Sequence, residues 1–111
     1  MRRILIALGV VALIATLGPL GFALGSGAKI GVSQKNRAFT PVSVTIAPGD
    51  TLAIHNDDEY VHQVFVDNPS FHFDSGEQDV GQTVEITFPV AGTFHVLCAI
   101  HPKMQLDVAV K

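Results

Sequence analysis

The stretch Cys98-Ala99-Ile100-His101-Pro102-Lys103-Met104 lies close to the C-terminus and decides how the rest of the chain is interpreted. It contains the only cysteine of the chain, a histidine three residues later and a methionine three residues after that. Thiolate, imidazole and thioether groups are soft or intermediate ligands, which select copper over magnesium or calcium. A blue-copper centre also needs a second histidine, and His62 is the best candidate. These residues therefore predict a copper electron-transfer domain.

The N-terminal residues have the composition of an export signal. Met1-Arg2-Arg3 precedes an uncharged, mostly apolar run from Ile4 to Ala28, which ends in the small residues Ser26-Gly27-Ala28. A basic start, an apolar centre and a small-residue cleavage site are typical of a secretory signal peptide. The run is also long enough to span a bilayer, so an uncleaved membrane anchor is the alternative. We expect a signal peptide or anchor at residues 1–28, one copper-binding domain at residues 29–111, and a periplasmic or otherwise exported protein.

Charge and cysteine content restrict the partners. Residues 29–111 carry five basic and ten acidic side chains, a formal charge of −5. This balance argues against nucleic-acid binding, which requires a basic surface, and favours a partner with a basic docking surface. The acidic run Asp57-Asp58-Glu59 is interpreted either as a solvated loop or, because it lies next to His62, as a docking patch for such a basic partner. A single cysteine in an exported protein cannot form an internal disulfide, and metal ligation explains its presence.

From Lys29 onward, short apolar–polar alternations are separated by turn residues, and no sustained helical periodicity is visible. The pattern predicts an all-β sandwich of about seven short strands. The strands are expected at residues 30–32, 42–46, 51–56, 62–66, 83–88, 93–98 and 104–110. Val42, Val44 and Ile46 are expected on one buried face. Residues 67–82 are polar and rich in turn formers, so we expect a loop there, with Phe71 and Phe73 covering the core beneath it.

Each ligand candidate has a simpler interpretation when it is taken alone. Cys98 is compatible with a small buried hydrophobe, His101 with a surface histidine and Met104 with a core residue. Their close spacing in a turn between two expected strands favours metal ligation instead. Phe94, Val96 and Cys98 share one parity, so the sulfur is expected to face the buried side. The remaining histidines are interpreted as surface residues: His55, His72 and His95.

Several segments resemble one family of copper proteins. Cys98-x-x-His101-Pro102-x-Met104, preceded by Ala91-Gly92-Thr93-Phe94, resembles the C-terminal ligand loop of the cupredoxins, with the spacing of the amicyanin branch. Upstream, Ile54-His55-Asn56-Asp57 and His62-Gln63-Val64-Phe65 resemble the region that carries the first histidine ligand of the family. Phe73-Asp74-Ser75-Gly76 and Pro48-Gly49-Asp50-Thr51 also resemble segments of that family. The resemblance covers residues 29–111.

The resemblance implies a Greek-key β-sandwich, cupredoxin-like, that binds one copper ion and cycles it between Cu(I) and Cu(II). The implied ligands are His62, Cys98, His101 and, axially, Met104, with electrons passing through the solvent-facing edge of His101. It also implies that Asn56 braces the ligand loop by hydrogen bonding. The inward parity of Asn56 agrees with this role, because a buried amide needs partners, and a turn-forming residue at a strand end is the alternative.

The sequence departs from the amicyanin pattern at three positions. Val61 stands where a proline is frequent, Gln63 where an asparagine is common, and Lys103 where amicyanin has an aromatic residue. Lys103 puts a positive charge on the usual docking face, so a methylamine dehydrogenase partner is not carried over to this chain.

The sequence therefore predicts a monomeric type 1 (blue) copper protein that shuttles single electrons between redox partner proteins outside the cytoplasm. A copper-binding protein for storage or delivery is the alternative. A structural zinc site is disfavoured because a thioether is a poor zinc ligand. No acid–base pair or activated nucleophile is recognisable beyond the ligands, so we expect no enzymatic activity. Contact with a membrane is expected only if the N-terminal segment stays uncleaved.

Overall fold

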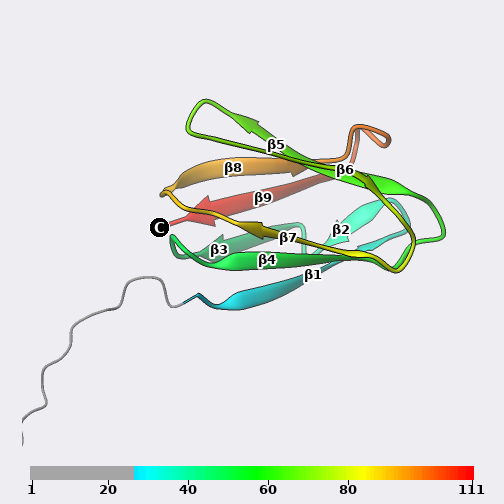
Figure 1. Cartoon of the computed structure of the whole chain (residues 1–111), viewed down its shortest axis with the longest axis horizontal. Coiled ribbons are helices and arrows are strands. Elements are labelled where there is room, and N and C mark those ends of the chain that lie inside the picture. Colours follow the sequence, from blue (N-terminus) through cyan, green and yellow to red (C-terminus); the bar gives the residue numbers. More distant parts are fainter. Residues whose placement is uncertain (1–26) are drawn as a thin grey trace, which may run out of the picture.

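The computed structural model describes residues 27–111, so the expected signal peptide or anchor lies outside the described residues except for its last two positions. Nine strands in this range form two sheets that pack face to face as a sandwich (Figure 1). They are β1 (Lys29–Lys35), β2 (Ala38–Thr40), β3 (Ser43–Ile46), β4 (Thr51–Asn56), β5 (His62–Asn68), β6 (Phe71–Gln78), β7 (Thr83–Thr87), β8 (Gly92–Leu97) and β9 (Gln105–Val110). This part of the chain contains no helix with the length and apolar character needed to cross a membrane.

The order of the strands brings four connections to one end of the sandwich. One sheet has the order β2-β1-β4-β7, and the other has the order β3-β9-β8-β5-β6. β1 pairs with β4 and β3 pairs with β9 in parallel, while the other neighbours are antiparallel. The β1–β2, β4–β5, β6–β7 and β8–β9 connections therefore lie together, at the right-hand end of Figure 1. Side chains from four separate chain segments meet at this end.

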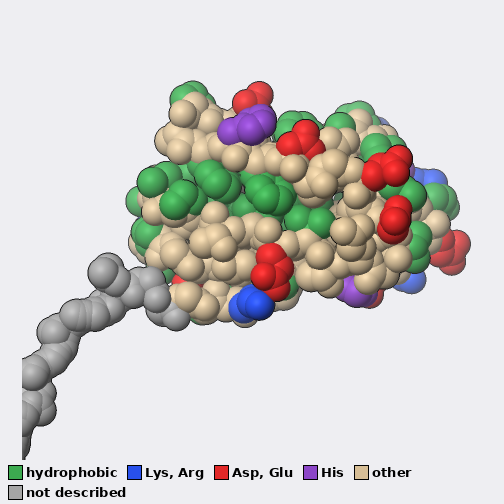
Figure 2. Space-filling model, in the orientation of Figure 1, with side chains coloured by type: hydrophobic (Ala, Val, Ile, Leu, Met, Phe, Trp, Pro, Cys, Tyr) green, Lys and Arg blue, Asp and Glu red, His purple; other side chains and the backbone are tan. Residues whose placement is uncertain are grey.

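Inward-facing side chains from both sheets form one core. Alternate residues of each strand point between the sheets, as period-two geometry requires. The largest fully buried hydrophobic residues are Phe39, Phe88, Phe94, Leu52, Ile54 and Ile86. Phe71 packs against Phe88 and Phe94 with ring centroids 5.2 and 6.0 Å apart, at the end away from the β8–β9 connection. Figure 2 shows hydrophobic side chains following the seam between the two layers.

Two of the nine strands differ from the sequence-based prediction. The loop expected at residues 67–82 is wrong because Phe71–Gln78 forms β6, which pairs with β5 at the edge of its sheet. An edge strand has a neighbour on one side only, and half of the residues of β6 are exposed, so its sequence lacks a clear apolar alternation. The three-residue strand β2 is too short for a periodic signal. Phe71 and Phe73 do pack against the core, but they do so from a strand.

The expected position of Val42 is also wrong. Val42 is 65% exposed, whereas Val44 is half-buried and Ile46 is buried. β3 begins at Ser43, so Val42 lies in the preceding bend, where the alternation of a strand does not apply. The other expected strands are confirmed, with ends shifted by a few residues.

Gln34 has a buried amide without a hydrogen-bond partner. The residue is 0% exposed, and neither its Oε1 nor its Nε2 has a partner among the described residues. An unpaired buried polar group costs about 1–3 kcal/mol. Gln34→Met keeps the length of the side chain and removes the amide. We expect it to raise the free energy of unfolding of the metal-free protein by about 1–3 kcal/mol, as measured by urea denaturation.

Gln78→Met is the matched control for this prediction. Gln78 is equally buried, but its Nε2 donates to the carbonyl oxygens of Ile54 at 3.0 Å and Gln82 at 2.9 Å. Replacing it removes one donor from each carbonyl, of which that of Gln82 keeps the N–H of Asn56 at 3.0 Å, and is expected to lower the free energy of unfolding. A Gln34→Met variant that is destabilised as strongly as Gln78→Met would contradict the prediction.

Candidate metal centre

Two segments that are distant in the sequence bring three donor side chains together. His62 is the first residue of β5, Cys98 directly follows β8, and His101 lies in the β8–β9 connection. β5 and β8 are antiparallel neighbours, so the start of one lies beside the end of the other. His62 and Cys98 are 0% and 1% exposed, and His101 is half-buried. The burial of Cys98 confirms the parity that the sequence predicts for β8.

The three donor atoms form a compact triangle. Nδ1 of His62 lies 3.1 Å from Nδ1 of His101. Sγ of Cys98 lies 3.7 Å from Nδ1 of His62 and 3.8 Å from Nδ1 of His101. A triangle with these sides has a circumradius of roughly 2.1 Å, which fits metal–nitrogen bonds of about 2.0–2.1 Å and metal–sulfur bonds of about 2.3 Å. The three residues are therefore arranged to hold a single metal ion.

Asp58 fixes which ring nitrogen of His62 faces the other donors. Oδ2 of Asp58 lies 3.0 Å from Nε2 of His62, and the two side chains are 3% and 0% exposed. A carboxylate accepts hydrogen bonds, so Nε2 donates to Asp58, and in the neutral tautomer that can ligate a metal Nδ1 keeps a free lone pair. Nδ1 is the atom that faces Cys98 and His101. The Asp58 contact therefore orients the ring in the way that metal-ligating histidines are usually oriented.

Asp58 is buried, so interpreting Asp57-Asp58-Glu59 as a solvated loop is wrong for its central residue. Asp58 is 4% exposed, whereas its two acidic neighbours are exposed. Burial by itself raises the pKa of this carboxyl, but hydrogen bonds from the backbone N–H of Arg37, from the His62 ring and from the backbone N–H of Glu59 lower it to about 2. The only feature of the sequence that points to this contact is that Asp58 lies four residues before His62.

The sulfur of Cys98 accepts a backbone hydrogen bond from the N–H of Gln63, at 3.3 Å. The Gln63 side chain donates to Oδ1 of Asp74 at 2.8 Å, and the N–H of Val64 donates to Oγ of Ser75 at 3.0 Å. These contacts lie at a register shift between β5 and β6, an irregularity that is common beside functional sites. They hold in place the N–H that faces the sulfur, as outer hydrogen bonds commonly do around a metal ligand.

His101 is the donor residue nearest to the surface. Its ring meets the His62 ring edge-on at 4.8 Å and the Tyr60 ring at 6.2 Å between centroids. Burial lowers the pKa of His101, positive charge on His62 (when that ring is protonated) and on Arg37 lowers it further, and Asp58 acts in the opposite direction. The imidazole therefore stays neutral to lower pH than usual, which leaves a ring nitrogen free to bind a metal.

Met104 lies immediately before β9 and is 2% exposed. Its backbone N–H donates to the carbonyl oxygen of His101 at 2.9 Å, which closes the turn between them. Both residues line the same surface pocket. The turn thus brings Met104 close to the donor triangle, and its role as an axial ligand stays a prediction.

Asn56 is buried and hydrogen-bonded through both atoms of its amide. Nδ2 donates to the carbonyl oxygens of Tyr60 at 2.8 Å and Gln78 at 3.3 Å, and Oδ1 accepts from the N–H of Asp58 at 2.9 Å. Asn56 therefore braces the β4–β5 connection that leads to His62. Among the described residues, its side chain makes no hydrogen bond to the β8–β9 connection, so the bracing acts on the side of the first histidine.

The other three histidines lie outside the donor cluster, as the sequence predicts. His55 contacts Oγ1 of Thr83 at 2.6 Å, His95 contacts Oδ1 of Asp107 at 2.8 Å, and His72 lies 3.7 Å from Oδ1 of Asp67. His72 and His95 are exposed, and His55 is half-buried. Each of them contacts a hydroxyl or carboxylate side chain and lies apart from His62, Cys98 and His101.

The donor chemistry of the cluster fits copper. Two imidazole nitrogens and a cysteine sulfur in one plane, with a methionine close by, are the set that distinguishes blue-copper sites. Structural zinc sites use four thiolate, imidazole or carboxylate ligands, and the described residues supply only three of these in the cluster.

Comparison with protein-family models also indicates copper binding. The family model of copper binding proteins, plastocyanin/azurin family, matches residues 27–111. No curated protein sequence matches the chain.

Solved structures of amicyanin and of a purple cupredoxin have a similar fold. Amicyanin from Paracoccus versutus is 25% identical, with a TM-score of 0.68 over 80% of this chain and 86% of that chain. The Cu(I) form of an amicyanin variant is 24% identical, with a TM-score of 0.69 over 80% of this chain and 87% of that chain. A purple cupredoxin from Nitrosopumilus maritimus is 20% identical, with a TM-score of 0.66 over 74% of this chain and 99% of that chain.

Proposed function

This chain belongs to the plastocyanin/azurin family of copper-binding proteins, and on that premise we propose that His62, Cys98, His101 and Met104 bind its one copper ion for electron transfer. The observation that carries the proposal is the donor triangle, with sides of 3.1, 3.7 and 3.8 Å. Bound copper supplies a one-electron couple between Cu(II) and Cu(I). The protein is thus a type 1 copper carrier of single electrons.

The residues around the triangle keep its geometry constant. Asp58 holds the His62 ring, and the Gln63 N–H holds the sulfur of Cys98. Both supports are part of a hydrogen-bonded network, so the donors need little rearrangement between redox states. His101 is the donor with a partly exposed ring, and it gives a partner the shortest path to the buried triangle. We therefore assign electron exchange to the exposed edge of His101.

The polar groups near the triangle are already engaged with one another. Asp58 accepts hydrogen bonds from the backbone and from His62, and Asn56 bonds to the backbone through both amide atoms. Neither group is free to act as an acid or base on a substrate. We infer that the protein is an electron carrier without enzymatic activity.

We also propose that the carrier works outside the cytoplasm as a monomer, between redox partner proteins. The basis for the location is the N-terminal pattern of an export signal in residues 1–28. Expression of the full chain in a bacterium, followed by intact-mass measurement of the periplasmic and membrane fractions, tests the location. Periplasmic protein that lacks the N-terminal segment supports export with cleavage. Protein of full mass in the membrane fraction supports the anchor instead.

The copper function is tested by the visible spectrum of the metal-free protein after stoichiometric Cu(II), and then after ascorbate. We expect an intense thiolate-to-copper band that bleaches on reduction and returns on reoxidation. A protein that stays colourless, or that yields its copper to a mild chelator while reduced, would favour the storage or delivery function. Copper retained against the chelator through repeated cycles would exclude that alternative.

Replacing Met104 by leucine is expected to leave copper bound and to raise the reduction potential. A weak axial thioether tunes a blue-copper potential, and its removal favours Cu(I). Voltammetry of the loaded variant measures the change. Leu106→Met, a volume-conserving exchange at a buried position of β9, is the control and should leave the potential unchanged. An equal potential in Met104→Leu and the wild type would make Met104 a core residue.

A further inference from the structure

An open pocket of about 460 Å³ lies beside His101 at the end of the sandwich. Its lining consists of Arg37, Ile100, His101, Pro102, Lys103 and Met104. Two of these six residues are cations, and none of them is a carboxylate. Ile100 is 46% exposed and adds an apolar surface next to the charges. The pocket therefore combines a redox-active edge, apolar contact area and positive charge.

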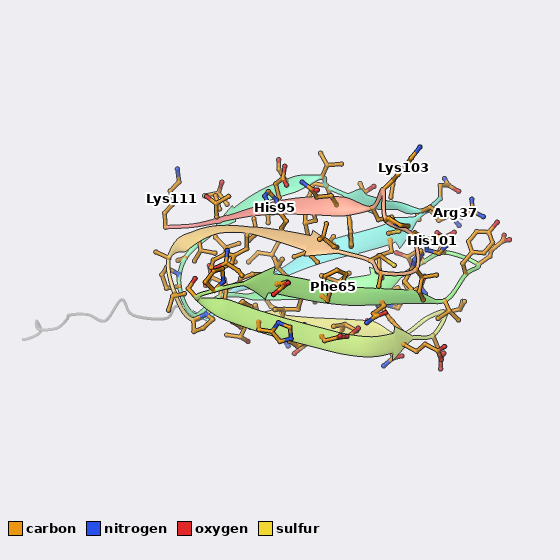
Figure 3. The ribbon with its side chains drawn as sticks, turned by 90° about the horizontal axis from the view of Figure 1, so that it is seen from above. Arg37, Phe65, His95, His101, Lys103 and Lys111 are labelled. Atoms are coloured by element: carbon orange, nitrogen blue, oxygen red, sulfur yellow. The ribbon has the colours of Figure 1, made fainter. Side chains whose placement is uncertain are left out.

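Basic residues are concentrated at this end although the described chain is acidic overall. Arg37 and Lys103 lie beside His101, whereas Lys111 lies at the opposite end (Figure 3). Lys35 is the last residue of β1 and belongs to the same end as Arg37. Lys29 lies at the other end of β1 and pairs with Glu85 at 2.9 Å. Three of the five basic residues of the folded domain thus lie at the end that carries His101.

The exposed carboxylates at this end belong to other elements. Asp57 and Glu59 lie in the β4–β5 connection, Glu77 lies in β6, and Asp79 follows β6. Glu77 and Asp79 lie toward the β6 and β7 edge, whereas Asp57 contacts β1, where its Oδ2 accepts a hydrogen bond from Oγ of Ser33 at 2.6 Å. Figure 2 shows acidic side chains gathered at the right-hand end of the molecule. The lining of the pocket is therefore positively charged and free of carboxylates, although exposed carboxylates lie elsewhere on the same end.

Arg37 is held in place by unusual local structure. Its φ is 55° and that of Asn36 is 54°, a left-handed turn that normally places glycine at the second position. This conformation costs an L-residue with a side chain roughly 1–2 kcal/mol. The Arg37 N–H donates to the buried Asp58 carboxylate at 2.8 Å, and its guanidinium lies 4.2 Å from the centre of the Tyr60 ring. Strain of this kind is typical of positions with a functional role.

We propose that this pocket docks a redox partner protein through acidic side chains that flank the partner's own redox group. The inference rests on the proposed electron-transfer function. The net charge of the domain favours a basic partner at long range, but salt screens charges beyond about 8 Å at physiological ionic strength. At contact distance the charges beside His101 are those of Arg37 and Lys103. Asp58 adds no negative surface there because it is buried and hydrogen-bonded.

Paramagnetic line broadening tests the docking surface without electron transfer. The probe is hexacyanochromate(III) added to the ¹⁵N-labelled, Cu(I)-loaded protein. We expect the anion to broaden the amide signals of Arg37, Ile100 and Lys103 and to leave that of Lys111 sharp. The cationic probe hexaamminechromium(III) should broaden signals near Glu59 and Asp79 instead. The proposal would be overturned if the cation broadened the pocket signals. It would also be overturned if the anion broadened no signals at all.

Charge variants and a peptide complete the test. Arg37→Gln and Lys103→Gln are each expected to weaken anion binding at least about threefold. Lys111→Gln is the matched control at the opposite end and should not change it. A short polyglutamate peptide should shift the same pocket signals. Binding of hexacyanochromate without any effect of the peptide would reduce the pocket to a small-anion site and contradict a protein partner.

Failure of this inference is distinguishable from failure of the proposed function. A protein without a blue band or reversible reduction would contradict electron transfer, whichever probe binds the pocket. A reversible blue protein whose pocket binds the cationic probe would contradict only the acidic partner.

Discussion

Replacing Cys98 by serine is expected to abolish the intense visible absorption of the copper-loaded protein. The band requires charge transfer from a thiolate to copper, and Cys98 is the only cysteine in the chain. A serine hydroxyl is not deprotonated at neutral pH, so it does not replace the thiolate as a ligand. We expect the affinity for Cu(II) to fall by more than about 100-fold, beyond the usual effect of losing an outer hydrogen bond. Copper titration followed in the visible range, with a competing chelator, measures both quantities.

Histidine variants give the matched comparison for this result. His62→Gln removes a buried donor and should also eliminate the blue band, whereas His95→Gln changes an exposed histidine of β8 and should retain it. Thermal unfolding of the metal-free variants establishes that each of them is folded. A folded Cys98→Ser protein that is still blue would remove Cys98 from the site.

Asp58→Asn is expected to weaken copper binding by about 10–100-fold, the usual cost of losing the partner of a metal-ligating histidine. If the amide nitrogen of asparagine faces His62, it donates toward Nε2, which would move the ring proton to Nδ1, and it leaves the N–H of Arg37 without an acceptor. In the opposite orientation of the amide, the N–H of Glu59 loses its acceptor. The first arrangement blocks the atom that faces Cys98. Either arrangement costs about 1–3 kcal/mol of stability, because one backbone N–H loses its acceptor. Copper competition and urea denaturation of the metal-free protein measure the two effects.

Asp107→Asn is the control for this second prediction. Asp107 also contacts a histidine, with Oδ1 2.8 Å from Nδ1 of His95, but both side chains are about half exposed. Exposed pairs of this kind contribute little, so copper affinity and stability should stay near those of the wild type. The ¹⁵N chemical shifts of His62 in the metal-free protein report its tautomer directly. Wild-type shifts and affinity in Asp58→Asn would show that another group orients the ring.

The donor residues can be recognised in the sequence because their chemistry is unusual and their spacing is short. A lone cysteine followed at three-residue steps by His101 and Met104 is a set of donors that core packing alone does not require. His62 is harder to identify, since it lies 36 residues before Cys98. Its assignment depends on the neighbouring segments that resemble the cupredoxin pattern. The structure brings His62, Cys98 and His101 together, and the ligand role of Met104 still depends on experiment.

The strands of the core can be predicted because their alternation is imposed by burial on one face. β4 and β7 show this alternation clearly, with Leu52 and Ile54 facing Ile86 and Val84 in register. β6 escapes prediction because an exposed edge strand needs little apolar surface. The prediction for Val42 is wrong because alternation does not say where a strand begins.

The sequence by itself determined the metal, the donor types and the sandwich class, since these depend on residue chemistry and on a period of two along the chain. Tertiary structure alone decided what surrounds the donors. It buried Asp58 against His62, and it brought Arg37 from the β1–β2 turn to the side of His101. The physical reason is that burial and local charge depend on which distant segments become neighbours. No periodicity within one strand encodes that choice.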